Sequence, residues 1–410
     1  MQNLAFFNAI LKEDYLGPIR EQINQSTILL KRLRRNEEDV GGRAAIVPLH
    51  VGRNSGVGAR SDGGTLPAAG RQLYDRAQYV TAYNYGRIQI TGPTIKASRK
   101  DKYAFVKAVD SEIKGMVKDL KDDINRQLFM DRTGVLATCA VVPAVGAGGI
   151  TTVTVDSSMY IQRGMMVDFV DAANVTPGGR RVGTAAAGYL VTGRPSATSI
   201  TVLGDLAGAG VIATDLIVRQ GNYLQEMMGL GGIVSNTNPG PAAPNSILVG
   251  NIDRTVAGNE FWMANVMAAG GQLRALTLDL MQQAWDASEL EGGEVSMLMS
   301  THDIRRRYLA LVKADGRFVN TMEFDGGFKT IEFNEKPFFV DRHCQPNRIY
   351  FLDESSLELY RMSDFDWMDE NGSVLDKVSG VDAYEAVLYK YATLGSNACN
   401  KNTLLTDLST

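Results

Sequence analysis

Apolar positions recur at helical spacing in two long segments of the chain. In residues 14–35 they lie three, four or seven residues apart, and a basic run at 31–35 suits the C-terminus of a helix. In residues 98–134 they recur every three or four residues behind Ser98 and Asp101, a pair spaced like a capping box. The pattern predicts an N-terminal amphipathic helix and a second helix of about 30 residues, roughly 45 Å long.

Residues 43–95 show the alternation of β-strands instead. One alternating run covers residues 46–51, and a longer one, rich in Tyr, Val and Ile, covers residues 79–90. Glycine-rich residues 52–71 separate the two runs and are far more than a hairpin turn needs. The pattern predicts a long two-stranded arm with a glycine-rich tip. Because an isolated two-stranded ribbon is marginally stable in water, we expect the arm and the N-terminal helix to pack on a second copy of the chain.

Short β-like runs fill residues 138–220, where no helical period is present. Turns rich in Gly, Pro and Ala separate them, and together they predict a small inserted β-barrel or sandwich. The runs lie at 150–155, 165–170, 189–192, 200–203 and 216–219.

A linker-like stretch at 235–244 precedes a mixed α/β segment. Thr277 and Thr301 are placed as N-caps of two helices that end at Leu290 and Val312. Further strands are predicted at 295–299, 328–333, 337–341, 348–352 and 381–394, and long loops at 286–294 and 313–327. A short polar tail follows the last strand.

Composition places the chain among folded globular proteins. It has 410 residues, of which 44% are hydrophobic and 21% charged, which predicts two or three folding units rather than disorder. Its three cysteines are widely spaced, so neither a disulfide framework nor a zinc site is expected. No signal peptide and no apolar window of about 18 residues is present, which predicts a soluble chain made in the cytoplasm.

Charge is nearly balanced overall but unevenly distributed along the chain. The 42 Lys and Arg against 46 Asp and Glu give a net charge of −4. Residues 1–100 carry 15 basic and 8 acidic side chains, whereas the remaining 310 residues carry 27 and 38. A basic front and an acidic back indicate that copies of the chain attract each other.

The chain offers little catalytic chemistry. Its three histidines are His50, His302 and His343, and their spacing matches no known metal-binding motif. His343 and Cys344 would point to opposite faces of a strand, which favours a structural thiol. The glycine-rich loop lacks the Gly-Lys-Ser/Thr of a phosphate-binding loop, and the acidic stretch at 362–369 favours solvation or a subunit contact over a cation site. We therefore predict no catalytic residue, no cofactor and no metal.

Four arginines lie along the predicted arm: Arg53, Arg60, Arg71 and Arg76. Arginine forms bidentate pairs with carboxylates, so these residues are candidates for clamping the arm to the acidic part of a neighbour. A second interpretation is that they only keep a glycine-rich ribbon soluble. Contact with nucleic acid is a third, weakened because the tyrosines of the arm lie in its strand rather than among the arginines.

The order of these elements resembles that of tailed-bacteriophage major capsid proteins with the Hong Kong 97-type fold. Residues 47–49 (VPL) through 63–67 (GGTLP) resemble the extended E-loop, and 123–128 (DINRQL) with 131–134 (DRTG) resemble the end of the spine helix. Residues 277–285, 307–309, 331–341 and 349–352 resemble the axial domain. No single string is diagnostic, and the ordered combination carries the resemblance over nearly the whole chain.

The resemblance implies an α+β fold with an inserted β domain. Its implied parts are an N-arm (1–42), an E-loop (43–95), a peripheral domain with the spine helix (96–137), the β-rich insertion (138–220), a linker or peripheral return (221–244), an axial domain (245–360) and a peripheral C-terminal strand with a tail (361–410). Contacts between subunits are predicted for the arm (Arg53, Arg60, Arg71, Arg76, Leu66 and Pro67), the N-terminal helix (Leu16, Ile23, Leu30 and Arg34) and the loop with Asp315 and Arg317.

The function implied by the resemblance is structural. Copies would assemble into the hexamers and pentamers of an icosahedral virion capsid around double-stranded DNA, in the host cytoplasm. The implied partners are other copies of the chain, portal and scaffolding proteins, a decoration protein, and packaged DNA through weak nonspecific contact, with no membrane. The alternatives are the shell of an encapsulin-type bacterial nanocompartment, a tail-tube or other virion protein, and, remotely, a cytoplasmic hydrolase.

Two features depart from the family pattern. Some members join their subunits by a Lys–Asn isopeptide bond whose lysine lies in the E-loop, but no lysine occurs here between Lys31 and Lys96. That crosslink is therefore not expected. Other members begin with a long scaffolding segment that is cleaved off, whereas about 42 residues precede this arm, so we expect a separate scaffolding protein.

Overall fold

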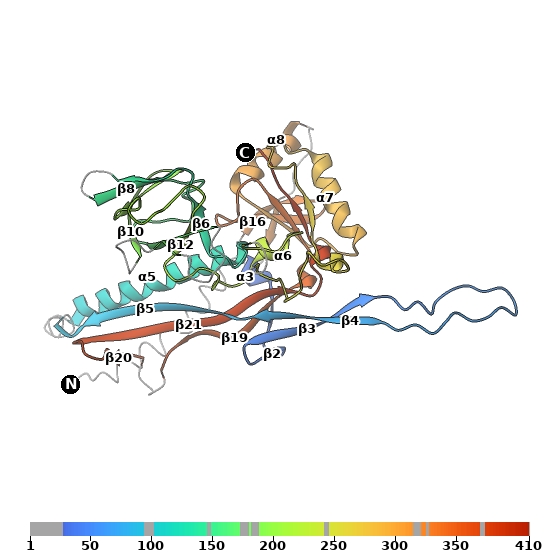
Figure 1. The fold of residues 1–410 in the computed structure, drawn as a ribbon, viewed down its shortest axis with the longest axis horizontal. Helices are drawn as coiled ribbons and strands as arrows, with labels where there is room; N and C mark the ends of the chain where they lie inside the picture. The colour runs from blue at the N-terminus through green and yellow to red at the C-terminus, as the bar shows by residue number, and fades with distance from the viewer. Residues whose placement is uncertain are drawn as a thin grey trace.

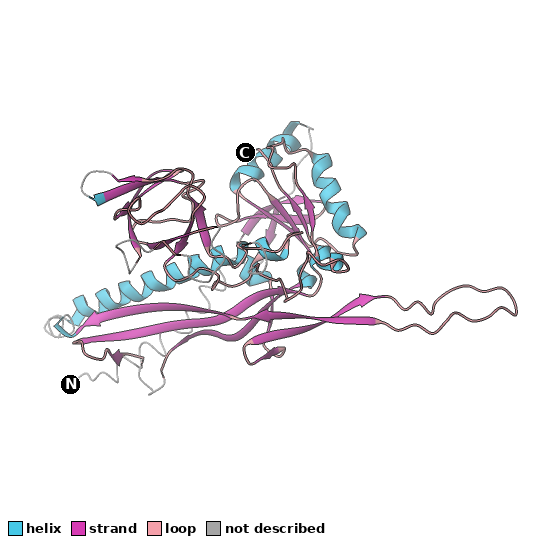
Figure 2. Cartoon of the chain, in the orientation of Figure 1, coloured by secondary structure: helices cyan, strands magenta, loops and turns pink. Residues whose placement is uncertain are grey.

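A computed structural model describes residues 28–93, 102–145, 149–172, 180–181, 188–241, 246–314, 321–324, 328–369 and 374–409. It shows an elongated α+β molecule, with two compact lobes on one side of a long sheet and an arm that projects from one end (Figures 1 and 2). The predicted fold class is confirmed. The predicted domain boundaries remain predictions, with the differences noted below.

The long helix α5 (Lys102–Phe129) lies along the long sheet, as Figure 1 shows. The apolar stripe predicted for this helix is buried in the main hydrophobic core, at Ile113, Val117, Leu120, Ile124 and Leu128. The strands beneath it are β1 (Arg34–Asn36), β19 (Leu357–Trp367), β20 (Asp376–Lys377), β21 (Ala383–Ser396) and β5 (Ala82–Thr91). A Cβ atom on Gly86 of β5 would lie 3.1 Å from the Met116 side chain, so this glycine lets the helix lie close to the sheet.

The arm differs from its prediction in its second strand. It is built by β2 (Val40–Gly41), β3 (Ala44–Gly52) and β4 (Leu73–Val80) in one antiparallel sheet. The run at 79–90 is divided, because the Thr81 amide donates to the Arg43 carbonyl, and the chain then leaves the arm as β5 to pair with β21. The second strand of the arm therefore comes from residues before this run.

The N-terminal helix is described only as α3 (Ile28–Arg32), which is followed by β1 rather than by helix up to residue 35. Leu29, Leu30 and Leu33 are buried in the core of their own chain. Arg32 forms a bidentate ion pair with Glu354 at 2.5 and 2.6 Å, which holds α3 against the body. The expectation that this segment lacks an intramolecular surface is therefore wrong for its end, and Leu16 and Ile23 lie outside the described residues.

The predicted insertion is a seven-stranded sheet with its own core, in the order β6-β12-β9-β10-β11-β8-β7. Backbone bonds from Ala140 to Thr154 and from Asp156 to Thr138 join the end of β6 to the end of β8, which closes the sheet into a barrel. Its strands are β6 (Val135–Thr138), β7 (Ala144–Val145), β8 (Ile150–Thr154), β9 (Met166–Val170), β10 (Tyr189–Ser196), β11 (Ser199–Leu203) and β12 (Leu216–Arg219).

The second lobe is a seven-stranded mixed sheet with two helices, α7 (Leu278–Leu290) and α8 (His302–Ala314). The Thr277 hydroxyl caps α7 by accepting from the Leu280 amide, as predicted. Thr301 precedes α8 as predicted, and its carbonyl accepts from the Arg305 amide. Its hydroxyl is buried without a hydrogen-bond partner among the described residues, so the predicted side-chain cap is wrong. The sheet runs in the order β13 (Asn265–Met267), β22 (Thr403–Leu405), β18 (Ile349–Leu352), β14 (Met297–Ser300), β17 (Lys336–Val340), β16 (Phe328–Phe333) and β15 (Thr321–Phe324).

Three segments predicted to be irregular are partly regular. The C-terminal residues are not a polar tail, because β22 lies between β13 and β18, and Leu405 and Leu408 are fully buried in this lobe. The loop predicted at 286–294 begins as the last turn of α7, and the loop predicted at 313–327 contains β15. Short helices also occur among the described residues, at α6 (Leu230–Ile233), η3 (Glu260–Trp262), η4 (Glu354–Ser356) and η5 (Cys399–Lys401).

Candidate subunit-contact surface

The base of the arm is fixed to the body by one buried face. Ala45, Val47 and Leu49 of β3 and Ala77 and Tyr79 of β4 belong to the main core, while the residues between them are exposed. This alternation is what the two-residue period of a strand produces when one face packs and the other does not.

Tyr79 attaches the base of the arm to the body through hydrogen bonds to Ser396 of β21. Its hydroxyl donates to the Ser396 carbonyl at 2.9 Å and accepts from the Ser396 amide at 3.0 Å. Its ring stacks on that of Tyr360, with the centroids 5.9 Å apart. Burial raises the pKa of Tyr79, so the hydroxyl stays protonated and can keep donating. The direction in which the arm leaves the body is therefore set by β21.

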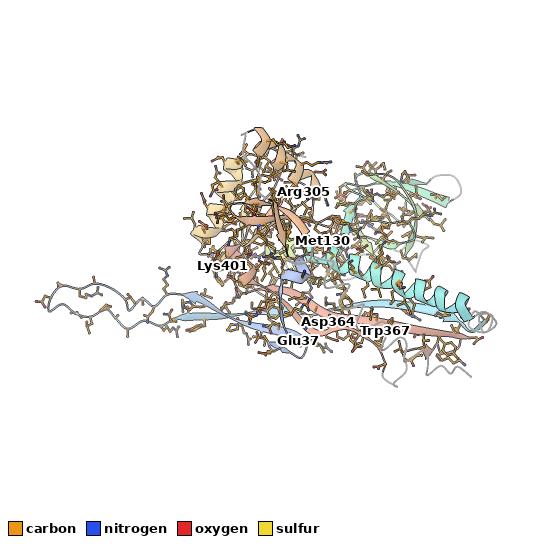
Figure 3. All side chains as sticks on the ribbon, turned by 180° about the vertical axis from the view of Figure 1, so that it is seen from behind. Glu37, Met130, Arg305, Asp364, Trp367 and Lys401 are labelled. Carbon is orange, nitrogen blue, oxygen red and sulfur yellow. The ribbon has the colours of Figure 1, made fainter. Side chains whose placement is uncertain are left out.

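Beyond this base the arm contacts no other part of the chain that the structure describes. Residues 53–72 form no strand, and Val57, Leu66 and Tyr74 are 85%, 81% and 73% exposed. Figure 3 shows the side chains of this segment standing clear of both lobes. Large apolar side chains left in water on a thin ribbon are typical of a surface that is covered by a partner.

The arm arginines have no acidic partner among the described residues of their own chain. Arg53, Arg60, Arg71 and Arg76 are exposed, and no ion pair joins any of them to a carboxylate of the described residues. The Arg60 guanidinium donates to the Thr65 and Ala59 carbonyls at 2.9 Å, which curls the tip on itself. The structure thus collects the arginines, Leu66 and the half-exposed Pro67 on one projecting element, and their role between subunits stays a prediction.

The other predicted contact residues are placed differently. Leu30 is enclosed in the core of its own chain, so its predicted contact with a neighbour is wrong. Arg34 is exposed on the edge strand β1, 3.5 Å from Glu358. Asp315 and Arg317 lie outside the described residues.

Sequence reasoning missed a buried charge cluster where α5 meets the barrel. Arg126 is 3% exposed and pairs with Asp123, at 3.1 Å, and with Glu226. Burial alone would lower the pKa of Arg126, but the two carboxylates raise it, so the guanidinium stays charged. The pair of Asp123 and Arg126 could have been predicted, because the two residues stand three positions apart on one helix. The pair with Glu226 could not, because Glu226 is distant in the sequence.

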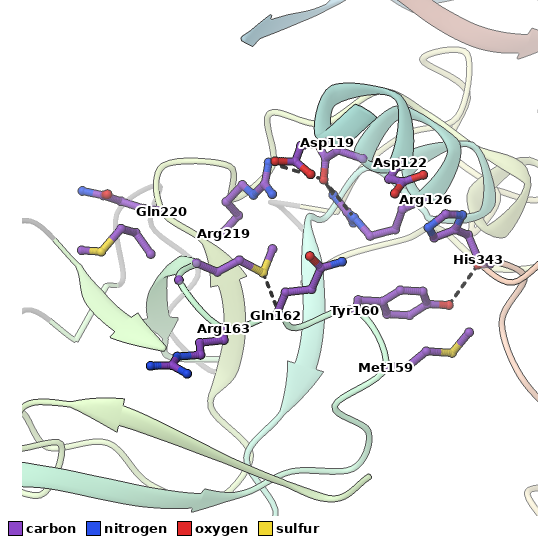
Figure 4. A pocket seen from close by; sticks show the side chains of 14 residues that line it. Asp119, Asp122, Arg126, Met159, Tyr160, Gln162, Arg163, Arg219, Gln220 and His343 are labelled. Atoms are coloured by element: carbon purple, nitrogen blue, oxygen red, sulfur yellow. Dashed lines mark hydrogen bonds and ion pairs between the residues drawn. The ribbon is translucent and has the colours of Figure 1, made fainter. Parts of the chain in front are cut away.

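A polar cavity of about 480 Å³ opens beside this cluster, between α5 and the barrel (Figure 4). Arg219 of β12 reaches toward Asp123 at 3.7 Å, and the Tyr160 hydroxyl of the barrel donates to the His343 carbonyl at 3.1 Å. Three aspartates and three arginines line the cavity, so their charges cancel. We interpret the cavity as part of the contact between the barrel and the body.

The chemical groups singled out in the sequence have structural surroundings. Cys139, Cys344 and Cys399 are free and buried, and burial raises the pKa of Cys139 to about 12. Asp364 of the acidic stretch accepts from Arg361 at 2.9 Å and from Lys390 at 3.2 Å, which explains it without a cation. Among the described residues no group of three or more metal-ligating side chains converges, and no helix is long and apolar enough to cross a membrane.

The paired carboxylates make stability depend on acid pH. Burial would raise the pKa of Asp364, but Lys390 and neighbouring hydrogen bonds hold it below its usual value, and the pKa of Asp123 is lowered in the same way by Arg126. A carboxyl with a lowered folded pKa contributes stability that is complete above its unfolded pKa, about 3.9, and is lost as the pH falls through the folded value.

We therefore expect the free energy of unfolding, measured by urea denaturation of the unassembled chain, to fall steadily from about pH 5 downward. Asp364→Asn should lower stability at pH 7 and make the fall below pH 5 shallower. Ser363→Ala, next to it in the strand, is the matched control and should keep the wild-type slope. An unchanged slope in Asp364→Asn would show that this carboxyl does not contribute.

Comparisons with known proteins bear on the fold. No protein-family profile matches the chain, and no curated protein matches its sequence. The structure resembles a chain of the cyanophage A-1(L) capsid asymmetric unit, with a TM-score of 0.55 and 13% identity, over 94% of this chain and 93% of that one. The capsid of an empty GTA particle aligns at a TM-score of 0.46 and 11% identity, over 94% and 91% of the two chains. The SrpI encapsulin of Synechococcus elongatus PCC 7942 aligns at 0.44 and 8%, over 94% and 88%.

The match to the cyanophage capsid chain covers nearly all of both chains, so it concerns the whole architecture rather than one lobe. An identity this low speaks for architecture rather than for shared residues. The chain has the Hong Kong 97-type capsid fold that its sequence resembles.

Proposed function

We propose that this chain is the major capsid protein of a tailed bacteriophage, and that its copies form the hexamers and pentamers of an icosahedral shell around double-stranded DNA. The observation that carries the proposal is the arm. It is rigidly anchored at Tyr79 and Ser396, yet its outer residues 53–72 have no surface among the described residues of their own chain to lie on.

An anchored arm of this kind favours a closed assembly over a simple dimer. The arm and the surface that receives it are different parts of the molecule, so each copy would give one arm and receive another. Such head-to-tail contacts generate rings when the rotation closes. Rings of copies are the capsomers from which a shell is built.

The charge distribution supports the same arrangement. The arm carries four exposed arginines, whereas the remainder of the chain after residue 100 is acidic, with 38 Asp and Glu against 27 Lys and Arg. Opposite charge steers the arm onto a neighbour and fixes its register. A net charge of −4 also suits a wall that holds DNA of any sequence without gripping it.

The role is structural rather than enzymatic. The thiols are buried and protonated, and Asp123 and Asp364 are engaged in ion pairs. Portal and scaffolding proteins and a decoration protein are proposed as further partners, which guide and complete the shell, whereas the contacts that form particles are made by copies of this chain alone.

Charge reversal in the arm tests its proposed contact. Arg60→Glu with Arg71→Glu should weaken the attachment of the arm, because each new carboxylate faces the acidic surface of a neighbour. Particles should dissociate at lower temperature and lower salt than wild type. Asp62→Lys with Asp75→Lys, on the same arm, is the matched control and should not weaken particles. If particles of the Arg60→Glu, Arg71→Glu variant resist heat and salt as well as wild type, these arginines do not hold the arm on a neighbour.

Sedimentation of the purified chain, followed by nuclease treatment, tests the function itself. We expect fast-sedimenting particles when the chain is expressed alone, and nuclease-protected genomic DNA inside particles made together with the packaging proteins of the same virus. Particles that instead enclose a specific enzyme and exclude DNA would favour a nanocompartment shell.

A further inference from the structure

One face of the barrel is unusually uniform. The outward side chains of β10, β11 and β8 form rows that cross the three strands. The apolar row is Leu190, Leu203 and Ile150, and the hydroxyl row is Thr192, Thr201 and Thr152. Ser199 and Thr154 complete the face. The alternate residues of the same strands point inward and fill the barrel core.

This face is exposed and carries no charge. Leu203, Ile150 and Leu190 are 50%, 39% and 37% exposed, so no described part of the chain covers them. Every residue of these rows has an aliphatic or a hydroxyl-bearing side chain, whereas 21% of the residues of the whole chain are charged. The charged side chains nearest to these rows in the sequence lie at the strand ends: Arg194, near the end of β10, donates to the Ser158 hydroxyl, and Asp156 and Asp205 follow β8 and β11.

The face is also preorganised. The Thr192 hydroxyl donates to the Thr201 hydroxyl at 3.0 Å, which holds two side chains of the central row in place. The closed barrel and its separate core fix the three strands beneath. A centre without charged side chains is the composition of a protein interface rather than of a solvated surface.

We propose that this face, residues of β10, β11 and β8 centred on Thr201, binds the same face of a second copy of the chain. The inference rests on the proposed function, because it assumes that many copies assemble. It goes beyond the arm contact by assigning a second interface, made by the barrel.

The absence of charged side chains from these rows indicates which surface binds the barrel face. The arm of a neighbour would place arginines on a surface that holds no carboxylate to pair with them, and the acidic body would bury carboxylates without a cation. Neither cost arises when two copies of the uncharged face meet. Their apolar and hydroxyl rows provide matching surfaces, and a contact between identical patches is the symmetric kind that pairs subunits.

The contact predicts a specific charge rescue. In a face that meets itself, residue 201 of one copy lies near residue 201 of the other. Thr201→Lys alone and Thr201→Glu alone should each lower the yield of particles at least about tenfold, because like charges meet in the interface. An equimolar mixture of the two variants should restore the yield, because opposite charges then meet.

Ile212→Lys is the matched control. Ile212 is also an exposed apolar residue of the barrel, 46% exposed, but it lies outside the three strands. This variant should assemble like wild type, and all variants should unfold as unassembled subunits at similar temperatures.

The readout is particle yield by sedimentation and electron microscopy of the full-length chains. Wild-type yield from Thr201→Lys alone would overturn the proposal, because the face would then be uncovered. Loss of particles that the mixture does not restore would also overturn it, because the face would then meet a different surface. A wild-type chain that forms no particles at all would instead contradict the proposed function, and this inference with it.

Discussion

Replacing residues 53–72 with an Asn-Gly turn is expected to abolish particle assembly while the chain still folds. Gly52 and Leu73 are paired at the end of the ladder between β3 and β4, so a two-residue turn can close the hairpin at this point. The removed segment contributes no side chain to any core of the described residues. Its loss should therefore cost little stability in the subunit, but it removes the whole outer arm.

Thermal unfolding and sedimentation separate these two effects. The shortened chain should unfold within a few degrees of wild type and should sediment as subunits or small oligomers. Removing only 61–64 at the tip is the graded control and should give particles of reduced stability. Normal particles from the fully shortened chain would show that the arm is not needed for assembly.

Arg126→Met is expected to have the largest effect on stability of any single substitution considered. The change leaves Asp123 and Glu226 buried without their main partner, and both are less than a tenth exposed. Breaking one side of a buried ion pair typically costs about 3–5 kcal/mol. Because these residues join α5 to the chain that returns from the barrel, the loss should also loosen the barrel.

Urea denaturation measures this loss, with Arg219→Met as its matched control. Arg219 faces the same carboxylate at 3.7 Å but is 38% exposed, so its removal should cost less than about 1 kcal/mol. Adding Glu226→Gln to Arg126→Met should recover part of the stability, because one orphaned charge is removed. Equal costs for the two methionine variants would contradict the importance assigned to the buried cluster.

The elements that the sequence predicts well are those whose pattern is local. The stripe from Ile113 to Leu128 needs only helical periodicity, and the barrel strands need only short β-like runs between turns. The glycine-rich tip of the arm is likewise visible in the sequence, because its composition excludes a packed core. The projecting part of the candidate surface can therefore be identified from the amino-acid sequence alone.

The errors arise where distant residues decide the outcome. The run at 79–90 looks like one strand, but Thr81 binds Arg43 while the following residues pair with β21, some 300 positions away. Leu404 and Leu405 lie in a polar context, and only pairing with β18 makes their strand central. Leu30 looks available to a neighbour because nothing in the sequence shows that Arg32 meets Glu354. The link from Arg126 to Glu226 escapes prediction for the same reason.

Cryo-electron microscopy of the full chain, expressed alone and purified, shows whether its copies form a shell through their arms. We expect closed icosahedral particles of uniform diameter, in which residues 53–72 of each copy lie on an adjacent copy and the rest of the subunit keeps the fold described above. Single subunits at assembly concentrations, or particles in which the arm stays free of every neighbour, would contradict this expectation.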